Sequence, residues 1–158
     1  MLKRVQHDRI MLDINKLRKT EARIITIGSY PAIIQSILDF DYIAGKTKPS
    51  IVGVIATGRK FERFFFGKKE ILIPVFSDVK QVPQKIKEEV NLFINLSSGR
   101  RTLSSTQLVL QSFPNILGGS LFAENIPEQH SLQLRTFFSP RTSPQPSPNR
   151  RGSYKEEY

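Results

Sequence analysis

The sequence contains no cysteine and no tryptophan among its 158 residues. Without cysteine, disulfides, zinc–thiolate centres and thiol nucleophiles are all excluded. No apolar run approaches the roughly 20 residues that a membrane-spanning helix requires. The basic start of the chain is interrupted by Asp8 and Asp13, which is unlike a signal peptide. These absences favour a protein of a reducing compartment, and we expect a cytoplasmic location without membrane contact.

Histidine is also scarce, with His7 and His130 alone in the chain. Neither is spaced with carboxylates as in a metal site or a nucleophilic triad, so we expect both at the surface. Asp39 and Asp41 could form an acid pair, but they close a predicted helix, where local hydrogen bonds are the simpler expectation. The sequence therefore predicts no catalytic residue and no metal ligand.

Positive charge is in excess, with a formal net charge of +10. Such an excess favours anionic partners, which include nucleic acids, membrane surfaces and phosphorylated ligands. Much of it lies at the two ends, since residues 1–20 carry six Lys or Arg against two Asp, and residues 135–158 carry five against two Glu. Solvated faces and tails account for much of this charge.

Apolar patterning predicts an α/β fold. Short β-branched runs predict buried strands at 23–28, 50–57, 91–96 and 116–123, with further extended segments at 61–66 and 70–76. Helical spacing is found at 29–40, 77–90, 102–113 and from 124 onward. Because strands alternate with helix-length segments, we expect a Rossmann-like parallel sheet with helices on both faces.

Three regions are predicted along the chain. Residues 1–20 form an N-terminal extension that we expect to be helical, and residues 21–135 form the Rossmann-like domain. Residues 136–158 are rich in Pro, Ser and Arg, with four prolines between positions 140 and 148. Such a segment buries too little apolar area to offset its ordering entropy, so we expect it to be disordered.

In an open parallel sheet, ligands bind at the carboxyl ends of the strands. The residues that follow the predicted strands are Gly28, Ser29, Tyr30 and Pro31, then Thr57, Gly58, Arg59 and Lys60, then Ser97, Ser98, Gly99, Arg100 and Arg101, and finally Glu124 and Asn125. Gly28 allows close approach of a ligand, and a helix that starts at Pro31 presents free N–H groups to a phosphate. The set predicts a pocket for a phosphorylated, nucleotide-like cofactor.

Each part of this predicted pocket also has a purely structural interpretation. The dinucleotide fingerprint G-x-G-x-x-G is absent, since "GSYPAI" retains one glycine. A glycine that ends a strand is commonly just a turn, and the four basic side chains can be solvated loop charges. "FERFFFGKK" mixes aromatic and basic residues, as single-strand nucleic-acid surfaces do, although packing of Phe64 and Phe66 on one strand face explains it more simply.

Four segments in order carry a family resemblance: "SILDFDYIAGKTKPSIVGVI", "FFGKKEILIPVFSDV", "NLFINLSSGRRTLSST" and "FAENIPE". They resemble the CoA-binding domain of ATP-citrate lyase or citryl-CoA synthetase and, more distantly, that of the succinyl-CoA synthetase alpha subunit. The similarity covers roughly residues 14–134. It implies a domain that holds coenzyme A for an enzyme that forms an acyl-CoA.

The resemblance also implies which residues contact coenzyme A. The turn Gly28, Ser29 and Tyr30 corresponds to the one that lies against the CoA phosphates, although it lacks the extra glycine of the synthetases. Arg59, with Lys60 beside it, corresponds to a basic contact after the second strand, and Ser97 and Ser98 correspond to the loop that lines the groove. The last contact corresponds to Ala123, Glu124 and Asn125, where asparagine replaces a glycine and has to tolerate a left-handed backbone.

Enzymes of this family react through a phosphohistidine in a further domain, and neither its glycine-rich loop nor an ATP-grasp domain is found in this sequence. The resemblance therefore implies a CoA-positioning part that is not catalytic alone and works with those other domains or subunits. "ENIPEQHSLQL" continues into "TFFSPRTSPQPSPNRRG", so a truncated or frameshifted reading frame is one interpretation and a stand-alone module another. The competing functions are a non-enzymatic module for NAD or an adenine nucleotide, and, least favoured, a basic nucleic-acid-binding module.

Overall fold

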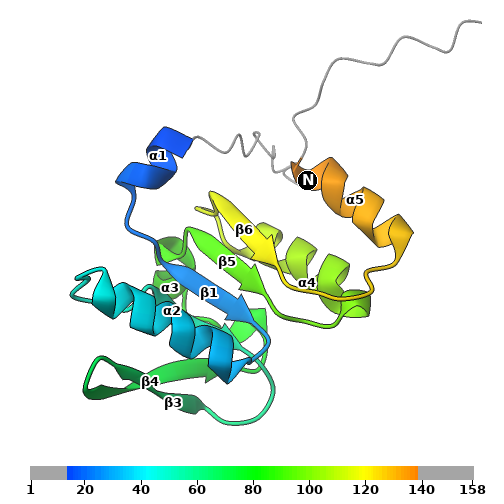
Figure 1. Ribbon diagram of the computed structural model, residues 1–158. Helices are drawn as coiled ribbons and strands as arrows, with labels where there is room; N and C mark the ends of the chain where they lie inside the picture. The colour runs from blue at the N-terminus through cyan, green and yellow to red at the C-terminus, as the bar shows by residue number, and fades with distance from the viewer. Residues whose placement is uncertain (1–13, 139–158) are drawn as a thin grey trace, which may run out of the picture.

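The computed structural model describes residues 14–138, and these form a six-stranded sheet flanked by helices (Figure 1). The strand order is β3-β4-β2-β1-β5-β6. The strands are β1 (Ile24–Ile27), β2 (Ile51–Ile55), β3 (Phe61–Phe66), β4 (Lys69–Phe76), β5 (Leu92–Asn95) and β6 (Gly118–Leu121). All neighbouring pairs are parallel except β3 and β4, which form an antiparallel hairpin at one edge. The α/β prediction is therefore confirmed, with that hairpin as the one departure from a parallel sheet.

The helices lie on both faces of the sheet (Figure 1). They are α1 (Ile14–Lys19), α2 (Pro31–Ile43), the short 3-10 turn η1 (Val79–Gln81), α3 (Gln84–Glu89), α4 (Gly99–Ser112) and α5 (Glu128–Phe138). Helix α2 covers one face, while α3 and α4 cover the other. Pro83 separates η1 from α3, because proline has no backbone N–H to donate and cannot continue a hydrogen-bonded turn.

Each face of the sheet has its own core. One cluster packs the α3 and α4 face and contains Ile25, Phe93, Val109 and Phe113, all at most 2% exposed. The second cluster lies under α2. Its buried members come from α2, β2, β3 and β4, and they are Ile34, Leu38, Ile51, Val54, Phe64, Ile73 and Val75. Since strand side chains alternate between faces, two cores are what a doubly covered sheet requires.

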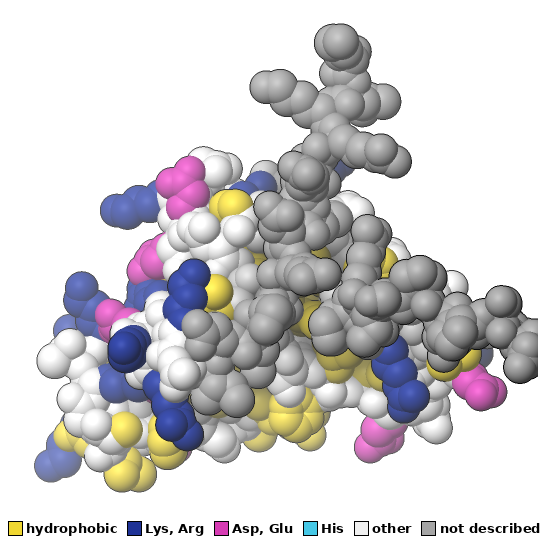
Figure 2. Space-filling model, turned by 90° about the horizontal axis from the view of Figure 1, so that it is seen from above, with side chains coloured by type: hydrophobic (Ala, Val, Ile, Leu, Met, Phe, Trp, Pro, Cys, Tyr) yellow, Lys and Arg dark blue, Asp and Glu magenta, His cyan; other side chains and the backbone are white. Residues whose placement is uncertain are grey.

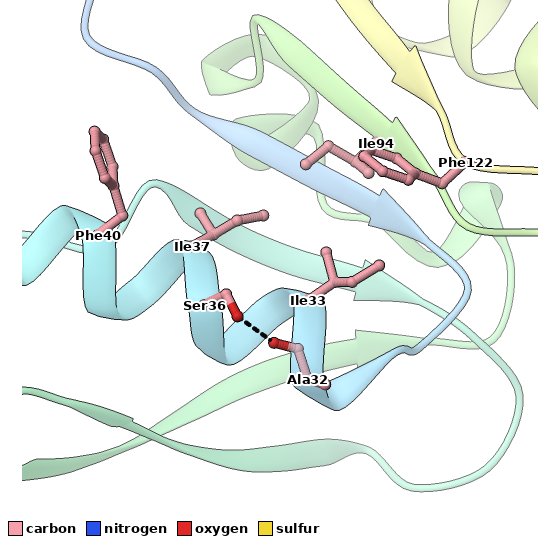
Figure 3. A pocket seen from close by; sticks show the side chains of 7 residues that line it. All are labelled: Ala32, Ile33, Ser36, Ile37, Phe40, Ile94 and Phe122. Atoms are coloured by element: carbon pink, nitrogen blue, oxygen red, sulfur yellow. Dashed lines mark hydrogen bonds between the residues drawn. The ribbon is translucent and has the colours of Figure 1, made fainter.

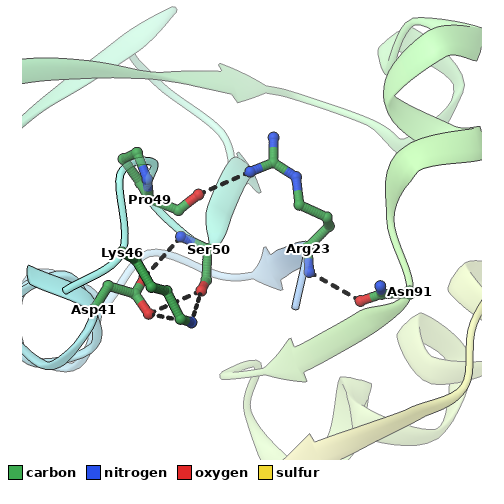
Figure 4. Close-up of polar contacts among 6 residues, drawn as sticks. All are labelled: Arg23, Asp41, Lys46, Pro49, Ser50 and Asn91. Carbon is green, nitrogen blue, oxygen red and sulfur yellow. Dashed lines mark hydrogen bonds and ion pairs between the residues drawn. The ribbon is translucent and has the colours of Figure 1, made fainter. Parts of the chain in front are cut away.

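The amino edge of the sheet is closed by buried polar contacts (Figure 4). Asp41, 1% exposed, accepts hydrogen bonds from the backbone N–H and the hydroxyl of Ser50 at 2.7 and 2.8 Å, and pairs with the Lys46 ammonium at 2.6 Å. Beside it, Arg23 donates to the carbonyl of Pro49 at 2.9 Å and its backbone N–H to Asn91 at 2.9 Å. Asp41 thus hydrogen-bonds locally, as predicted, and it fixes the start of β2 at the edge opposite the strand ends that define the candidate site.

Several boundaries differ from the sequence-based ones. Helix α4 begins at Gly99, three residues before the predicted start, so Arg100 and Arg101 are helical and not in a loop. The segment predicted as one helix from residue 77 begins with η1, which is capped by Asp78, because the Asp78 side chain accepts a hydrogen bond from the backbone N–H of Lys80. Helix α5 continues to Phe138, beyond the predicted domain end at 135.

The ends of the chain bear on two further predictions. Helix α1 occupies the last part of the predicted N-terminal extension. The first three residues of the predicted disordered tail, 136–138, are the end of α5. The remainder of both segments, at 1–13 and 139–158, lies outside the described residues.

Candidate functional site at the carboxyl edge of the sheet

The strand order creates a crevice between β1 and β5. From β1 the chain proceeds through α2 to β2 on one side, and β5 and β6 then lie on the other side. The helices that follow β1 and β5 consequently lie on opposite faces, which is the arrangement of a topological switch point. Ligands of doubly wound folds bind outside the strand ends at this point. The turns after β1 and β5 are therefore the centre of the candidate site.

The turns after β1 and β5 touch at Gly28. This residue has φ of +87°, a conformation that side chains rarely adopt, and a Cβ there would lie 3.2 Å from the carbonyl group of Leu96. Its backbone N–H donates to Ile55 at 2.8 Å, and that of Leu96 donates to Ile27 at 2.7 Å. Gly28 therefore allows close approach of the β5 exit, and the close approach of a ligand to Gly28 stays a prediction.

A buried amide holds the β5 exit in place. Asn95, 0% exposed, accepts hydrogen bonds from the backbone N–H and hydroxyl of Ser97 at 3.0 and 2.6 Å. Its amide nitrogen donates to the hydroxyls of Ser105 and Thr106 on α4 at 2.8 and 2.9 Å. Ser97 is thus engaged inside the protein. Ser98 is the exposed N-cap residue of α4, and its side chain makes no capping hydrogen bond.

The turn after β6 packs onto the start of α4. A Cβ on Gly99 would lie 2.5 and 2.6 Å from the carbonyl oxygens of Glu124 and Asn125, which is a clash with backbone. Asn125 has φ of +54°, so it adopts the left-handed backbone that the sequence required of it. Gly99 is therefore the residue that lets this turn reach the site.

The start of α4 is strongly positive. Arg100 and Arg101 are exposed in its first turn, where no acidic residue occurs. Helix N-termini already carry about half a positive charge. Two arginines there are repelled by this charge and by each other unless an anion is bound. Neither side chain forms an ion pair or hydrogen bond with another described residue. The arrangement suits a phosphate group.

Four more predicted residues extend the site along the same edge. Arg59 and Lys60 are exposed in the connection between β2 and β3, and their side chains have no ion-pair partner among the described residues. Tyr30 is the N-cap residue of α2 and is 56% exposed, with no side-chain capping bond. Pro31 occupies the first position of α2, as predicted.

The sequence-based reasoning missed Glu62. Ser29 in the β1 turn donates its hydroxyl hydrogen to Oε2 of Glu62, the second residue of β3, at 2.8 Å. The two residues are 33 positions apart, and no spacing in the sequence signals the contact. A carboxylate therefore stands beside the turn where we expected only groups that attract phosphate.

A hollow next to the site was also missed (Figure 3). It measures about 500 Å³ and lies between α2 and the β5–β6 half of the sheet. Its lining is almost wholly apolar, consisting of Ala32, Ile33, Ser36, Ile37, Phe40, Ile94 and Phe122. The single hydroxyl, on Ser36, is occupied by a hydrogen bond to the carbonyl of Ala32 at 2.8 Å. Because no charged side chain lines it, the hollow does not suit phosphate groups.

Within residues 14–138, histidine is represented by His130. His130 is half-buried in α5 and its Nδ1 has no hydrogen-bond partner, so the expectation of a surface histidine is only partly met. His7 lies outside the described residues. Over the described range, no group of three His, Cys, Asp or Glu is arranged to hold a metal ion. No helix there is long and apolar enough to cross a membrane.

Basic side chains do not merge into one surface on the side of the molecule that Figure 2 shows. Lys and Arg side chains are spread over that side, several of them beside Asp or Glu. Nucleic-acid-binding domains commonly concentrate their basic residues on one face. That view therefore gives the nucleic-acid hypothesis no added support.

The structure thus assembles the turns after β1, β5 and β6, with Glu62 against the first of them, along one edge of a doubly wound sheet. This combination defines a Rossmann-like ligand-binding domain. Sequence comparison gives the particular relationship. The chain is 31% identical to a probable ATP-citrate synthase subunit 1 of Schizosaccharomyces pombe over 121 residues, and 35% identical to human ATP-citrate synthase over 119 residues. No protein-family model matches the sequence.

Solved structures agree with this relationship. An ATP citrate lyase from Methanothrix soehngenii, in complex with citrate and coenzyme A, matches 75% of the chain with a TM-score of 0.69 and 26% identity. By homology the chain is therefore related to one region of the ATP-citrate lyases, and the resemblance in its sequence motifs is confirmed. The matched region is 75% of this chain but 19% of the fission-yeast protein and 10% of the human one. The chain thus spans a fifth or less of these relatives.

Proposed function

We propose that this chain binds coenzyme A at the carboxyl edge of the sheet and positions its thiol for an acyl-CoA-forming reaction of the ATP-citrate lyase type. The observation that carries the proposal is unpaired positive charge at the carboxyl edge of the sheet, in the connection after β2 and in the first turn of α4. Arg59, Lys60, Arg100 and Arg101 have no ion-pair partner within residues 14–138, and α2 and α4 both start at this edge without a side-chain capping bond.

Coenzyme A matches this charge distribution. It carries three phosphate groups and an uncharged arm that ends in a thiol. The phosphates can bind to the basic side chains and helix N-termini, while the uncharged arm extends away from them. The relative from Methanothrix soehngenii was solved with coenzyme A and citrate. An ATP citrate lyase from Methanosaeta concilii was solved in complex with (3S)-citryl-CoA. These complexes support the proposed ligand. The proposed contacts are Gly28, Ser29, Tyr30, Arg59, Lys60, Ser97, Ser98, Ala123, Glu124 and Asn125, and we propose Arg100 as a further one.

The role of such a site is orientation. A bound thiol that is held toward a reacting acyl group gains rate by proximity, without any catalytic side chain on this domain. ATP-grasp and phosphohistidine parts, on other domains or subunits, would supply the activated acyl group. A cytoplasmic location is part of the same proposal, and the cysteine-free sequence is compatible with it.

Calorimetric titration of the full chain with coenzyme A tests the proposal. We expect saturable one-to-one binding that weakens about tenfold, or about 1.4 kcal/mol, in each of the single variants Arg59→Ala and Arg100→Ala. Lys48→Ala is the matched control, because Lys48 is an exposed lysine in the α2–β2 connection at the opposite edge. Gly28→Val should abolish binding, since its side chain would meet the Leu96 carbonyl.

Two results would contradict the proposal. One is a folded chain that does not bind coenzyme A at millimolar concentration. The other is binding that weakens equally in Lys48→Ala and Arg59→Ala, since this would show a non-specific charge effect. Each variant's circular-dichroism melt is recorded first, so that loss of folding is not read as loss of the site.

A non-enzymatic module for NAD or an adenine nucleotide is the second candidate, and Glu62 favours it. No acidic residue directly follows β2, which by itself argues against a ribose contact of the NAD type. With Glu62 hydrogen-bonded to Ser29, a carboxylate is available at the site after all. Titration with NADH beside coenzyme A separates the two candidates, because the coenzyme A proposal requires the lower dissociation constant for coenzyme A.

A further inference from the structure

The contact between Ser29 and Glu62 joins the first ligand-binding turn to the β3–β4 hairpin. Glu62 pairs with Ile73 in the antiparallel register, near the end of β4 at which the neighbouring parallel strands also end. Phe64 lies two residues further along β3, so its side chain points to the same face as Glu62, and it packs in the core under α2. Its side chain therefore emerges on the α2 side of the sheet, beside the residue that precedes the cap of α2.

Part of the Glu62 carboxylate remains available. Oε2 accepts the hydroxyl of Ser29 at 2.8 Å, and no other described residue donates to the carboxylate or forms an ion pair with it. The residue is partly buried but its bond to Ser29 lies at the surface, so water reaches the carboxylate when no ligand is bound. Arg59 and Lys60, close by in the chain, leave it unpaired. A donor on a ligand can therefore take the place of water at the open acceptor position.

The chemistry of the carboxylate determines what it can bind. An ionised carboxylate only accepts hydrogen bonds, and it repels phosphate. An uncharged hydrogen-bond donor suits it best, and on a nucleotide the ribose hydroxyl is the uncharged donor that lies next to the phosphates. In doubly wound folds an acidic residue near the end of the second strand receives this hydroxyl.

Resting on the coenzyme A proposal above, we propose that Glu62 accepts a hydrogen bond from the ribose 2′-hydroxyl of the bound nucleotide and makes the site selective for ribonucleotides. Ser29 orients the carboxylate through Oε2, and the ribose completes its hydrogen bonding. Arg59 and Lys60 neutralise the neighbouring phosphate. Glu62 then binds the ribose of the nucleotide, and Arg59 and Lys60 bind its phosphate.

Adenosine 3′,5′-bisphosphate and its 2′-deoxy analogue test this, because they differ by the 2′-hydroxyl alone. The full chain is titrated calorimetrically with both compounds and with coenzyme A. We expect the ribonucleotide to bind about tenfold more tightly than the deoxy compound, the size of one hydrogen bond to a charged group. In Glu62→Ala this ratio should fall to near one, and in Glu62→Gln, which keeps an acceptor oxygen, it should fall to about threefold.

The absolute affinities distinguish a ligand contact from a structural one. Removing a negative charge beside two phosphates should leave binding of the deoxy compound unchanged or tighter in Glu62→Ala, whereas a damaged site would weaken both compounds equally. Glu70→Gln, on the same hairpin and already paired with Arg63 at 3.2 Å, is the matched control and should keep the wild-type ratio.

The outcomes separate the two proposals. A wild-type ratio near one, or a ratio that Glu62→Ala and Glu62→Gln leave unchanged, overturns the role of Glu62 even if coenzyme A binds and Arg59→Ala weakens it. Failure of all three ligands to bind the folded chain overturns the coenzyme A proposal and this one with it. If Glu62→Ala does not fold, Glu62→Gln alone decides, because its amide oxygen can still accept the Ser29 hydroxyl.

Discussion

Replacing Asn95 by alanine should destabilise the domain by about 3 kcal/mol. The amide is 0% exposed and makes four hydrogen bonds of 3.0 Å or less, two from Ser97 and one each to Ser105 and Thr106. At about 1 kcal/mol for each bond the upper figure is about 4 kcal/mol. Ser105 accepts its bond from Asn95; it still donates to the carbonyl of Arg101 at 2.8 Å, and the Ser97 hydroxyl at 3.1 Å can donate to it instead, so this lost bond costs little. The remaining three give about 3 kcal/mol.

Urea denaturation followed by circular dichroism measures this difference, since the chain has no tryptophan for fluorescence. The matched control is Asn115→Ala, because exposed Asn115 makes one hydrogen bond, to the carbonyl of Glu88 at 2.7 Å, and should cost less than about 1 kcal/mol. If Asn95→Ala costs no more than Asn115→Ala, the amide does not hold the β5 exit. The reasoning on the Ser97 turn would then be wrong.

Three further substitutions probe other parts of the molecule. Gly99→Ala should lower both thermal stability and coenzyme A affinity, because its Cβ would meet the Glu124 carbonyl at 2.5 Å, and an unchanged melting temperature would contradict the contact. Asp41→Ala should cost about 3 kcal/mol in urea denaturation, since the Ser50 N–H loses its acceptor and a cation loses its partner, with no effect on ligand affinity once folded. Phe113→Ala should cost about 3–5 kcal/mol by the same assay, because the ring is 2% exposed in the larger core, and a loss below 1 kcal/mol would argue against that core.

The sequence predicted much of the fold because local patterns encode local structure. The β-branched run before Gly28 predicted β1, and Pro31 predicted the start of α2, since fixed φ and a missing N–H favour that position. The start of α4 was placed three residues late. Gly99, Arg100 and Arg101 carry no apolar helical pattern, so the periodicity that marks the later turns of α4 gives no signal there.

The candidate site was predicted in part. The turns after β1, β5 and β6 were expected at one edge because the carboxyl ends of parallel strands meet there, and the structure brings Gly28 against Leu96 and Gly99 against Asn125. Glu62 was missed because it is one charged residue in an edge strand, and its partner Ser29 is far away in the chain. Asp41 was recognised as a local hydrogen-bonding residue, but its near-complete burial could not be read from "LDFDY".

The sequence by itself determined which segments become strands and helices, and which residues stand at their ends, because periodicity, glycine and proline act over a few residues. It also carried the family relationship in its motifs. Only the tertiary structure decided that β1 and β5 are neighbours, that the switch point lies between them, and that Ser29 meets Glu62. It alone formed the hollow between α2 and Phe122. The physical reason is that these features depend on the order in which strands pair and on side-chain packing between distant segments, which no local pattern specifies.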